Sequence, residues 1–206
     1  MALIKISTDT TYEPVTLADT KEFLRIDSTN DDELIKSLIT VSRRKAENYM
    51  KRTVIKSTYK MTMENFPGIT GYIELMRPPI STASSDMVIS FIKDTTILND
   101  TTQVGSTIYA IDHERLPSVV YPIYDNEWPS CVTDTKKDAV RVQYKAGYTT
   151  VSEIPEEIKL WIKMDVSNIY ENREPLIETQ AMKNIYPLGH PFYMGLLDPY
   201  VILDMS

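Results

Sequence analysis

Cysteine, histidine and glycine are scarce in this chain of 206 residues, and each scarcity excludes a class of site. The single cysteine, Cys131, cannot form an internal disulfide, which favours assembly in a reducing compartment. The two histidines, His113 and His190, stand far apart in the sequence, so a zinc site is not expected. The six glycines form no glycine-rich loop of the kind that binds phosphate. We therefore expect neither a metal site nor a cofactor.

Long apolar runs are missing as well. No run approaches the roughly 20 residues that a membrane-spanning helix needs, and residues 1–10 lack the apolar segment of a signal peptide. The hydrophobic content of 42% and the charged content of 25% are ordinary for a soluble globular protein. A chain of this length can bury one good core or two small ones.

Patterns that carry catalysis are equally scarce. Asp112-His113-Glu114 combines acids with a histidine, but it lies where a predicted strand ends, and a polar turn explains it better. The paired carboxylates Asp31-Asp32 and Glu156-Glu157 lie at predicted helix starts, where the helix dipole already favours them. We expect no catalytic residue and no enzyme. An unrecognised hydrolase would need a cleft with a perturbed acid–base pair, which no pattern here indicates.

Positive charge is concentrated in one segment of a chain whose net charge is −7. Residues 43–60 hold seven basic side chains and one acid, Glu47. One interpretation is a helix face whose charges meet acids on a neighbouring element. The other is a basic docking surface for an acidic partner subunit or a nucleic-acid backbone. In the second case the surface comprises Arg43, Arg44, Lys45, Lys51 and Arg52.

Helical periodicity dominates residues 1–56 after a short extended start. Thr16 and Asp19 resemble a capping box for a first helix that ends near Asp27. The acidic run at 30–33 then predicts the start of a long helix that ends near Arg52. Its apolar stripe has spacings of three and four, and comprises Leu34, Ile35, Leu38, Ile39, Val41, Ala46 and Tyr49.

Residues 57–150 change to the two-residue period of strands. The strands predicted in this segment cover residues 59–63, 72–75, 87–92, 107–111, 119–124 and 140–144, separated by clusters of Thr, Asn, Asp and Pro. Their spacing of about ten residues indicates an antiparallel, sandwich-like domain. We predict that this β domain is inserted between the helices before and after it.

A strand–turn–helix joint covers residues 140–174. Gly147 ends the last strand, and Pro155 opens a helix with apolar residues at Ile158, Trp161 and Ile162. This helix, within residues 151–180, should complete a small bundle with the N-terminal helices. Residues 181–206 contain too many prolines for one helix and too many apolar groups for a solvated tail. They either pack on their own domain or dock on another subunit as an extended tail.

The order of short landmarks along the chain resembles one known family. These landmarks are Pro14-Val15-Thr16-Leu17, Glu47-Asn48-Tyr49, Tyr59-x-Met61-x-Met63, Phe66-Pro67, Arg77-Pro78-Pro79, Trp128-Pro129, Val140-Arg141-Val142, Gly147-Tyr148, Ile154-Pro155, Tyr170–Glu174 and Leu196–Tyr200. Each is weak alone. Together, over nearly the whole chain, they resemble the head–tail connector (adaptor, or head-completion) proteins of tailed double-stranded DNA bacteriophages, in the version with a β insertion.

This resemblance implies a structural virion protein and no chemistry. Connectors of this kind form a ring, commonly of twelve copies, between the portal protein and the tail terminator, stopper or tail tube protein. The ring extends the channel through which double-stranded DNA passes without sequence preference. The implied location is the virion neck, after assembly in the host cytoplasm, with no membrane partner. The alternative function is a tail or baseplate interaction protein that binds through its β domain and assembles with threefold or sixfold symmetry.

Two residue sets follow from the resemblance. The first is a docking tail that contacts the portal, with Phe192, Tyr193, Met194, Leu196, Leu197 and Tyr200 as its contact residues. The second is a ring interface that comprises Leu160, Trp161 and Met164, because a ring subunit needs apolar groups on more than one helix face. An acidic chain suits a DNA conduit, since it does not bind the phosphates that pass. The basic segment would then face the portal or a neighbouring subunit.

Overall fold

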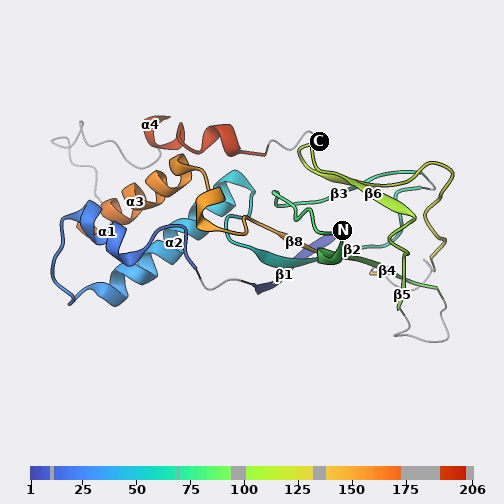
Figure 1. Cartoon of the computed structure of the whole chain (residues 1–206), viewed down its shortest axis with the longest axis horizontal. Coiled ribbons are helices and arrows are strands. Elements are labelled where there is room, and N and C mark those ends of the chain that lie inside the picture. Colours follow the sequence, from blue (N-terminus) through green and yellow to red (C-terminus); the bar gives the residue numbers. More distant parts are fainter. Residues whose placement is uncertain (10–11, 69, 94–100, 132–137, 173–190, 203–206) are drawn as a thin grey trace. The chain divides into compact units, whose positions relative to one another are not determined.

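The computed structural model describes the chain except residues 10–11, 69, 94–100, 132–137, 173–190 and 203–206, and the side chains of Thr101, Pro191 and Phe192. Its helices and antiparallel sheets confirm the predicted α+β class (Figure 1). The chain forms two compact units. Unit 1 comprises Met1–Thr11 and Ile55–Gly147, and unit 2 comprises Tyr12–Val54 and Tyr148–Ser206.

The larger sheet of unit 1 has five antiparallel strands in the order β1-β2-β8-β4-β5. These are β1 (Ala2–Thr8), β2 (Ser57–Met63), β8 (Val140–Ala146), β4 (Met87–Ile92) and β5 (Thr101–Gln103). The predicted division assigned residues 1–56 to the helical part, but β1 pairs with β2, with Ile4 opposite Lys60. The first eleven residues therefore lie in the unit that contains the strands. The short strand β5 was not predicted.

The smaller sheet has the order β3-β7-β6, formed by β3 (Ile73–Glu74), β7 (Val119–Pro122) and β6 (Tyr109–Asp112). Inward side chains of both sheets belong to one buried cluster, which includes Met61, Ile89, Val120, Trp128 and Tyr144. The Trp128 ring stacks on Phe66 at 5.0 Å between ring centroids, and its indole N–H donates to the Gly71 carbonyl oxygen at 2.6 Å. A short 3-10 turn, η1 (Ser84–Asp86), precedes β4.

Unit 2 contains the three main helices α1 (Leu17–Leu24), α2 (Asp32–Met50) and α3 (Glu156–Glu171). Thr16 caps α1, because its hydroxyl accepts the Asp19 backbone N–H at 3.0 Å. Asp31 occupies the corresponding position before α2 but makes no cap bond with its side chain. Its carboxylate instead accepts the Tyr170 hydroxyl of α3 at 2.6 Å. The helices bury an apolar core that includes Ile35, Ile39, Met50, Ile158, Trp161 and Ile162.

The strand–turn–helix joint ends β8 at Gly147, whose φ is +106°. A Cβ at this position would lie 2.6 Å from the Ile55 carbonyl group, so a side chain cannot be accommodated. The 3-10 turn η2 (Val151–Glu153) follows, and Pro155 occupies the N-cap position of α3, one residue before the predicted place.

Residues 181–206 are not an extended tail throughout. The structure has a helical turn at α4 (Pro191–Met194) and a 3-10 turn at η4 (Asp198–Tyr200) (Figure 1). Leu197 between them is 0% exposed. The remainder of this segment, residues 181–190 and 203–206, lies outside the described residues.

Candidate functional site

Arg43, the first residue of the predicted basic surface, lies inside unit 2 with 4% of its surface exposed. Its Nε and Nη2 donate to the two carboxylate oxygens of Glu13 at 2.6 and 3.2 Å, and its Nη1 donates to Glu47 at 3.0 Å. The other Glu47 oxygen accepts the Val54 backbone N–H at 2.9 Å. Burial lowers the pKa of Arg43, but the bonds to Glu13 and the charge of Glu47 outweigh it and raise the pKa.

The side chain of Lys45 contacts α3 as well as solvent. Its Nζ lies 2.7 Å from Asp165 Oδ1 and 5.8 Å from the centre of the Trp161 ring. Asp165 is fully buried, and its second oxygen has no hydrogen-bond partner among the described residues. Asp165 was not singled out in the sequence, although it lies on the buried side of α3 between Trp161 and Val166. A charge at an apolar helix position was the signal that could have found it.

Arg52 holds the C-terminal segment. Its Nε donates to the Tyr200 carbonyl oxygen, and burial lowers its pKa. Arg44 and Lys51 have exposed side chains on α2 and at its C-cap. Arg43, Lys45 and Arg52 make the contacts described above within unit 2, and the side chains of Arg44, Lys45 and Lys51 are exposed. Arg43 is a correction to the predicted surface, since a residue so deeply buried cannot form part of one.

The described end of the predicted docking tail packs on its own unit. The Ile202 N–H donates to the Met50 carbonyl oxygen at 3.0 Å, and the Tyr200 hydroxyl lies 3.0 Å from Glu157. The Tyr49 hydroxyl donates to Asp198 at 2.6 Å, a bond that raises the pKa of Tyr49. Leu197 is buried in the core, so it does not belong to the docking set that the sequence predicted.

The other described members of the docking set are partly accessible to solvent. Tyr193, Met194, Leu196 and Tyr200 are half-buried, so part of each remains accessible. The side chain of Phe192 lies outside the described residues. The structure therefore leaves a smaller contact surface at this end of the chain than the sequence predicted.

The predicted ring interface also divides by burial. Trp161 is a core side chain with 1% exposure, so it is unavailable to a neighbouring copy. Leu160 is exposed and Met164 is half-buried, and both lie on the side of α3 opposite its buried residues. These two remain candidates for contact between subunits.

Reactive groups do not gather anywhere in the described part of the chain. No group of three or more metal-binding side chains occurs there. His113 and Asp112 lie at the β6–β7 turn, where the Asp112 carboxylate accepts the Glu114 and Arg115 backbone N–H groups at 2.9 and 3.3 Å. This agrees with a polar turn. Among the described helices, none combines the length and apolar character needed to cross a membrane.

Comparison with known proteins places these features in context. Residues 14–77 match the model of the phage gp6-like head-tail connector protein family. A chain from the "Neck of empty GTA particle computed with C6 symmetry" aligns with a TM-score of 0.74 and 13% identity, covering 100% of this chain and 98% of the other. A chain from the "Virion of native gene transfer agent (GTA) particle" aligns at 0.71 and 15%, with the same coverage.

A third solved structure, "Neck of native GTA particle computed with C12 symmetry", aligns with a TM-score of 0.66 and 15% identity, again over 100% of this chain and 98% of the other. A search of the curated proteins finds no match. At these identities the structural likeness shows a shared fold. The resemblance to the head–tail connector family of tailed phages is confirmed by the family model over residues 14–77, and the likeness to the particle chains shows a shared fold over the whole chain.

Proposed function

We propose that this chain is a structural neck protein that forms a ring of twelve copies between the portal and the tail. The observation that carries the proposal is the fold, which matches chains from particle necks over the full length of both proteins. The family match over residues 14–77 supports it independently, because it comes from sequence alone. The ring extends the DNA channel, retains packaged DNA and offers a platform for the tail terminator, stopper or tail tube protein.

The charge distribution suits a conduit for DNA. The basic segment lies next to carboxylates, since Arg43 contacts Glu13 and Glu47, and Lys45 contacts Asp165. Its positive field at the surface is therefore weaker than the sequence suggests, and the chain keeps its net charge of −7. Phosphates gain little by binding such a surface, so DNA can slide past. Neither the family nor the site geometry supports an enzyme.

The portal contact, in this proposal, uses the basic side chains that remain exposed. Arg44 and Lys51 on unit 2 can meet carboxylates of the portal, while Tyr193, Met194 and Leu196 add apolar contact area. Reversing both charges, as Arg44→Glu with Lys51→Glu, should weaken pull-down of the portal protein and remove its salt dependence. Arg25→Glu, another exposed basic residue of unit 2, is the matched control. Equal binding by the double variant and the control would contradict this assignment.

Within the ring, the helical units of neighbouring copies are proposed to meet at Leu160 and Met164. Leu160→Ser changes an exposed side chain, so it should leave the unfolding temperature unchanged and reduce the assembled fraction. Phe23→Ser on α1, whose side chain is also 42% exposed, is the matched control. Similar losses in both variants would indicate a general solubility effect instead of an interface.

Particle symmetry tests the function as a whole. Electron micrographs of necks that contain this chain, averaged without imposed symmetry, should show a twelvefold ring directly below the portal. Native mass of the isolated assembly gives the copy number independently. A threefold complex at the distal end of the tail would refute the neck assignment and favour the tail or baseplate alternative.

A further inference from the structure

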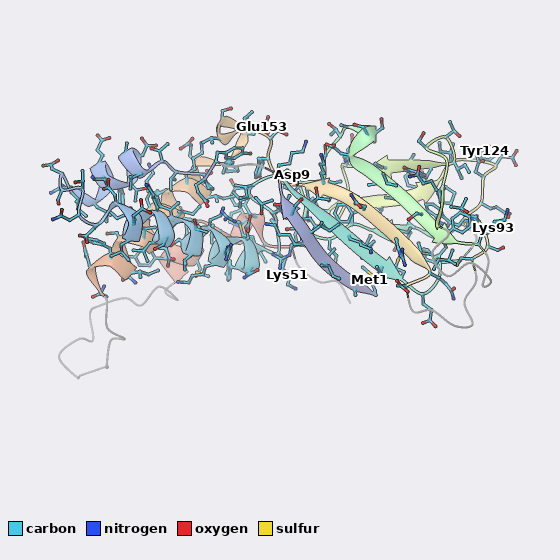
Figure 2. All side chains as sticks on the ribbon, turned by 90° about the horizontal axis from the view of Figure 1, so that it is seen from below. Met1, Asp9, Lys51, Lys93, Tyr124 and Glu153 are labelled. Atoms are coloured by element: carbon cyan, nitrogen blue, oxygen red, sulfur yellow. The ribbon has the colours of Figure 1, made fainter. Side chains whose placement is uncertain are left out.

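The two outer faces of unit 1 carry opposite charge, and both expose apolar side chains. On the larger sheet, successive residues of each strand point to opposite sides. The inward set includes Met61, Val142 and Ile89, which are all fully buried. The outward set therefore includes their chain neighbours, among them Lys60, Gln143 and Val88. Figure 2 shows this outer face, and no described helix or strand of unit 1 lies in front of it.

Cross-strand register aligns the outward residues of the larger sheet into rows. Ile4 pairs with Lys60, Lys60 with Gln143, and Gln143 with Val88. Ile4 and Ile6 are 57% and 51% exposed, on an edge strand that has no second neighbour among the described strands. Because an edge strand offers unpaired backbone groups as well as side chains, this border of the sheet is suited to contact.

The centre of the same face is a shallow depression of about 280 Å³. Its lining residues are Ile6, Lys60, Val88, Ser90, Arg141 and Gln143. The Lys60 ammonium has no carboxylate within ion-pair distance in the described part of the chain, and Arg141 contacts Asp138 at 3.0 Å through Nη2. The depression is therefore apolar at its border and basic at its centre, whereas Lys145, farther along the same face, is paired with Asp9 and Asp86 at 3.4 Å. We call this surface, together with Ile4, the basic face.

The outer side of the smaller sheet has the opposite character. Val120 of β7 is fully buried, so Tyr121 points outward, and it is exposed. Tyr72, one register step beyond the Ile73–Val120 pair, lies beside it and has the Arg115 guanidinium 4.7 Å from its ring centre. Tyr124, just beyond β7, is 96% exposed (Figure 2).

Carboxylates surround these tyrosines. Glu74 lies on β3, Glu114 in the β6–β7 turn, and Asp125 and Glu127 in the segment after β7, and all four are exposed. No ion pair links any of them to a described basic side chain within 4.0 Å. Tyrosine and arginine are enriched at the energetic centres of protein interfaces, more than aliphatic residues are. We call this surface, with Tyr72, Tyr121 and Tyr124, the acidic face.

We propose that the basic face of one copy docks on the acidic face of the next copy, as the contact between β units in the ring. This inference rests on the proposed ring. A closed ring needs a heterologous contact, in which each subunit presents two different and complementary surfaces. Opposite charge and exposed apolar groups on the two outer faces of one unit meet that requirement. Two basic faces would repel each other, so a twofold dimer through either face is disfavoured.

The size of the sheet sets the strength of this contact. Its five strands hold seven, seven, seven, six and three residues. At about 3.3 Å per residue and about 4.8 Å between strands, the face covers roughly 475 Å². The smaller sheet, with strands of two, four and four residues, offers less area. The contact therefore buries at most about 950 Å² in total, below the roughly 1,200–2,000 Å² of stable complexes. The contact is therefore weak for a single pair, and ring closure, which gives each copy two contacts, makes it effective. Because its charges are exposed, it should weaken as salt is raised.

Two complementary variants test the proposal. The first removes the charge and apolar contact of the basic face by Ile4→Ser with Lys60→Ser, and the second removes those of the acidic face by Glu74→Ser with Tyr121→Ser. The two altered faces then carry no introduced charges that could pair with each other. Each is the full chain, and sedimentation is measured up to about 1 mM, where a contact of about 4 kcal/mol is half-formed. The Leu160→Ser chain, which lacks the helical contact proposed above, should form higher oligomers, and each variant made in that chain should alone stay monomeric. An equimolar mixture should form dimers and nothing larger, because it restores one contact.

Every other outcome counts against the proposal. Oligomers formed by both variants alone mean that the ring uses other surfaces. Dimers formed by one variant alone mean a twofold contact through the face left intact. A mixture that stays monomeric, with both variants folded by circular dichroism and unfolding temperature, also overturns the inference. If micrographs still show a twelvefold neck ring in that case, the proposed function survives and only the contact is wrong.

Discussion

Replacing Leu197 by alanine tests whether the C-terminal segment belongs to the fold or is free to dock elsewhere. The side chain is fully buried in unit 2 between α4 and η4. Removing a fully buried leucine side chain loses its transfer free energy and leaves a cavity, together about 3 kcal/mol and within about 2–5 kcal/mol. A segment that merely rested on the surface would lose well under about 1 kcal/mol.

Two tryptophans allow each unit to be observed separately. Trp161 lies in unit 2 and Trp128 in unit 1, and both are buried. In a Trp128→Phe background, urea unfolding followed by fluorescence reports on unit 2 alone. With a slope of about 1–3 kcal/mol per molar urea, a loss of 3 kcal/mol moves the midpoint down by about 1–3 M. In a Trp161→Phe background, the Trp128 signal should not move.

Leu196→Ala is the matched control, because Leu196 is half-buried and the same atoms are removed. We expect a loss of about 1 kcal/mol or less for this variant. Equal losses at both positions, or a Leu197→Ala loss below about 1 kcal/mol, would refute the packing described for this segment. Portal binding is then measured for the same two variants. Leu196 is exposed enough to contact a partner and Leu197 is not, so the comparison distinguishes a role in binding from a role in packing.

Three further substitutions test the interior. Arg43→Met should lower the free energy of unfolding by about 3–5 kcal/mol, because Glu13 and Glu47 then face each other without their shared cation. Arg43→Lys should recover only part of this loss of stability. Thr16→Ala should cost about 1 kcal/mol through loss of the α1 cap, measured by thermal unfolding; no change would contradict the cap. Hydrogen bonds from Ser81 and the ammonium of Lys56 lower the pKa of Asp86 to about 2. A carboxyl group with a lowered pKa stabilises the fold above about pH 4, and this contribution is lost as the pH falls toward 2. Asp86→Asn should therefore lower the free energy of unfolding by about 1–2 kcal/mol at pH 7. It should also flatten the pH dependence of stability between about pH 4 and pH 2.

Periodicity alone located most elements of this fold, because each element satisfies a local rule. The helix that begins near Asp32 and the strand at 87–92 both follow from spacing. Strand β1 did not, since its pairing with β2 joins residues 49 to 60 positions apart, and no local pattern specifies that register. Strand β5 is three residues long, too short for any period to emerge.

The charges show where sequence reasoning reached its limit. Arg43, Arg44 and Lys45 look alike in sequence, but α2 turns them by about 100° per residue, into the core, toward solvent and toward α3 respectively. Helical spacing indicated that Arg43 would be buried. The buried residues Ile39, Ala46 and Met50 lie four positions before it, three after it and seven after it. A basic residue in that register needs buried carboxylates, yet sequence cannot say that Glu13 is one of them.

The same reasoning explains why the proposed function rests on surfaces. The buried charges of unit 2 pair internally, so they contribute to its stability and offer nothing to a substrate. What remains accessible is an exposed basic pair on unit 2, exposed apolar groups on α3, and two faces of opposite charge on unit 1. A protein that catalyses converges its polar groups on one cavity, whereas a ring subunit distributes complementary groups over separate faces. The described residues follow the second pattern, which is the one that the proposed ring requires.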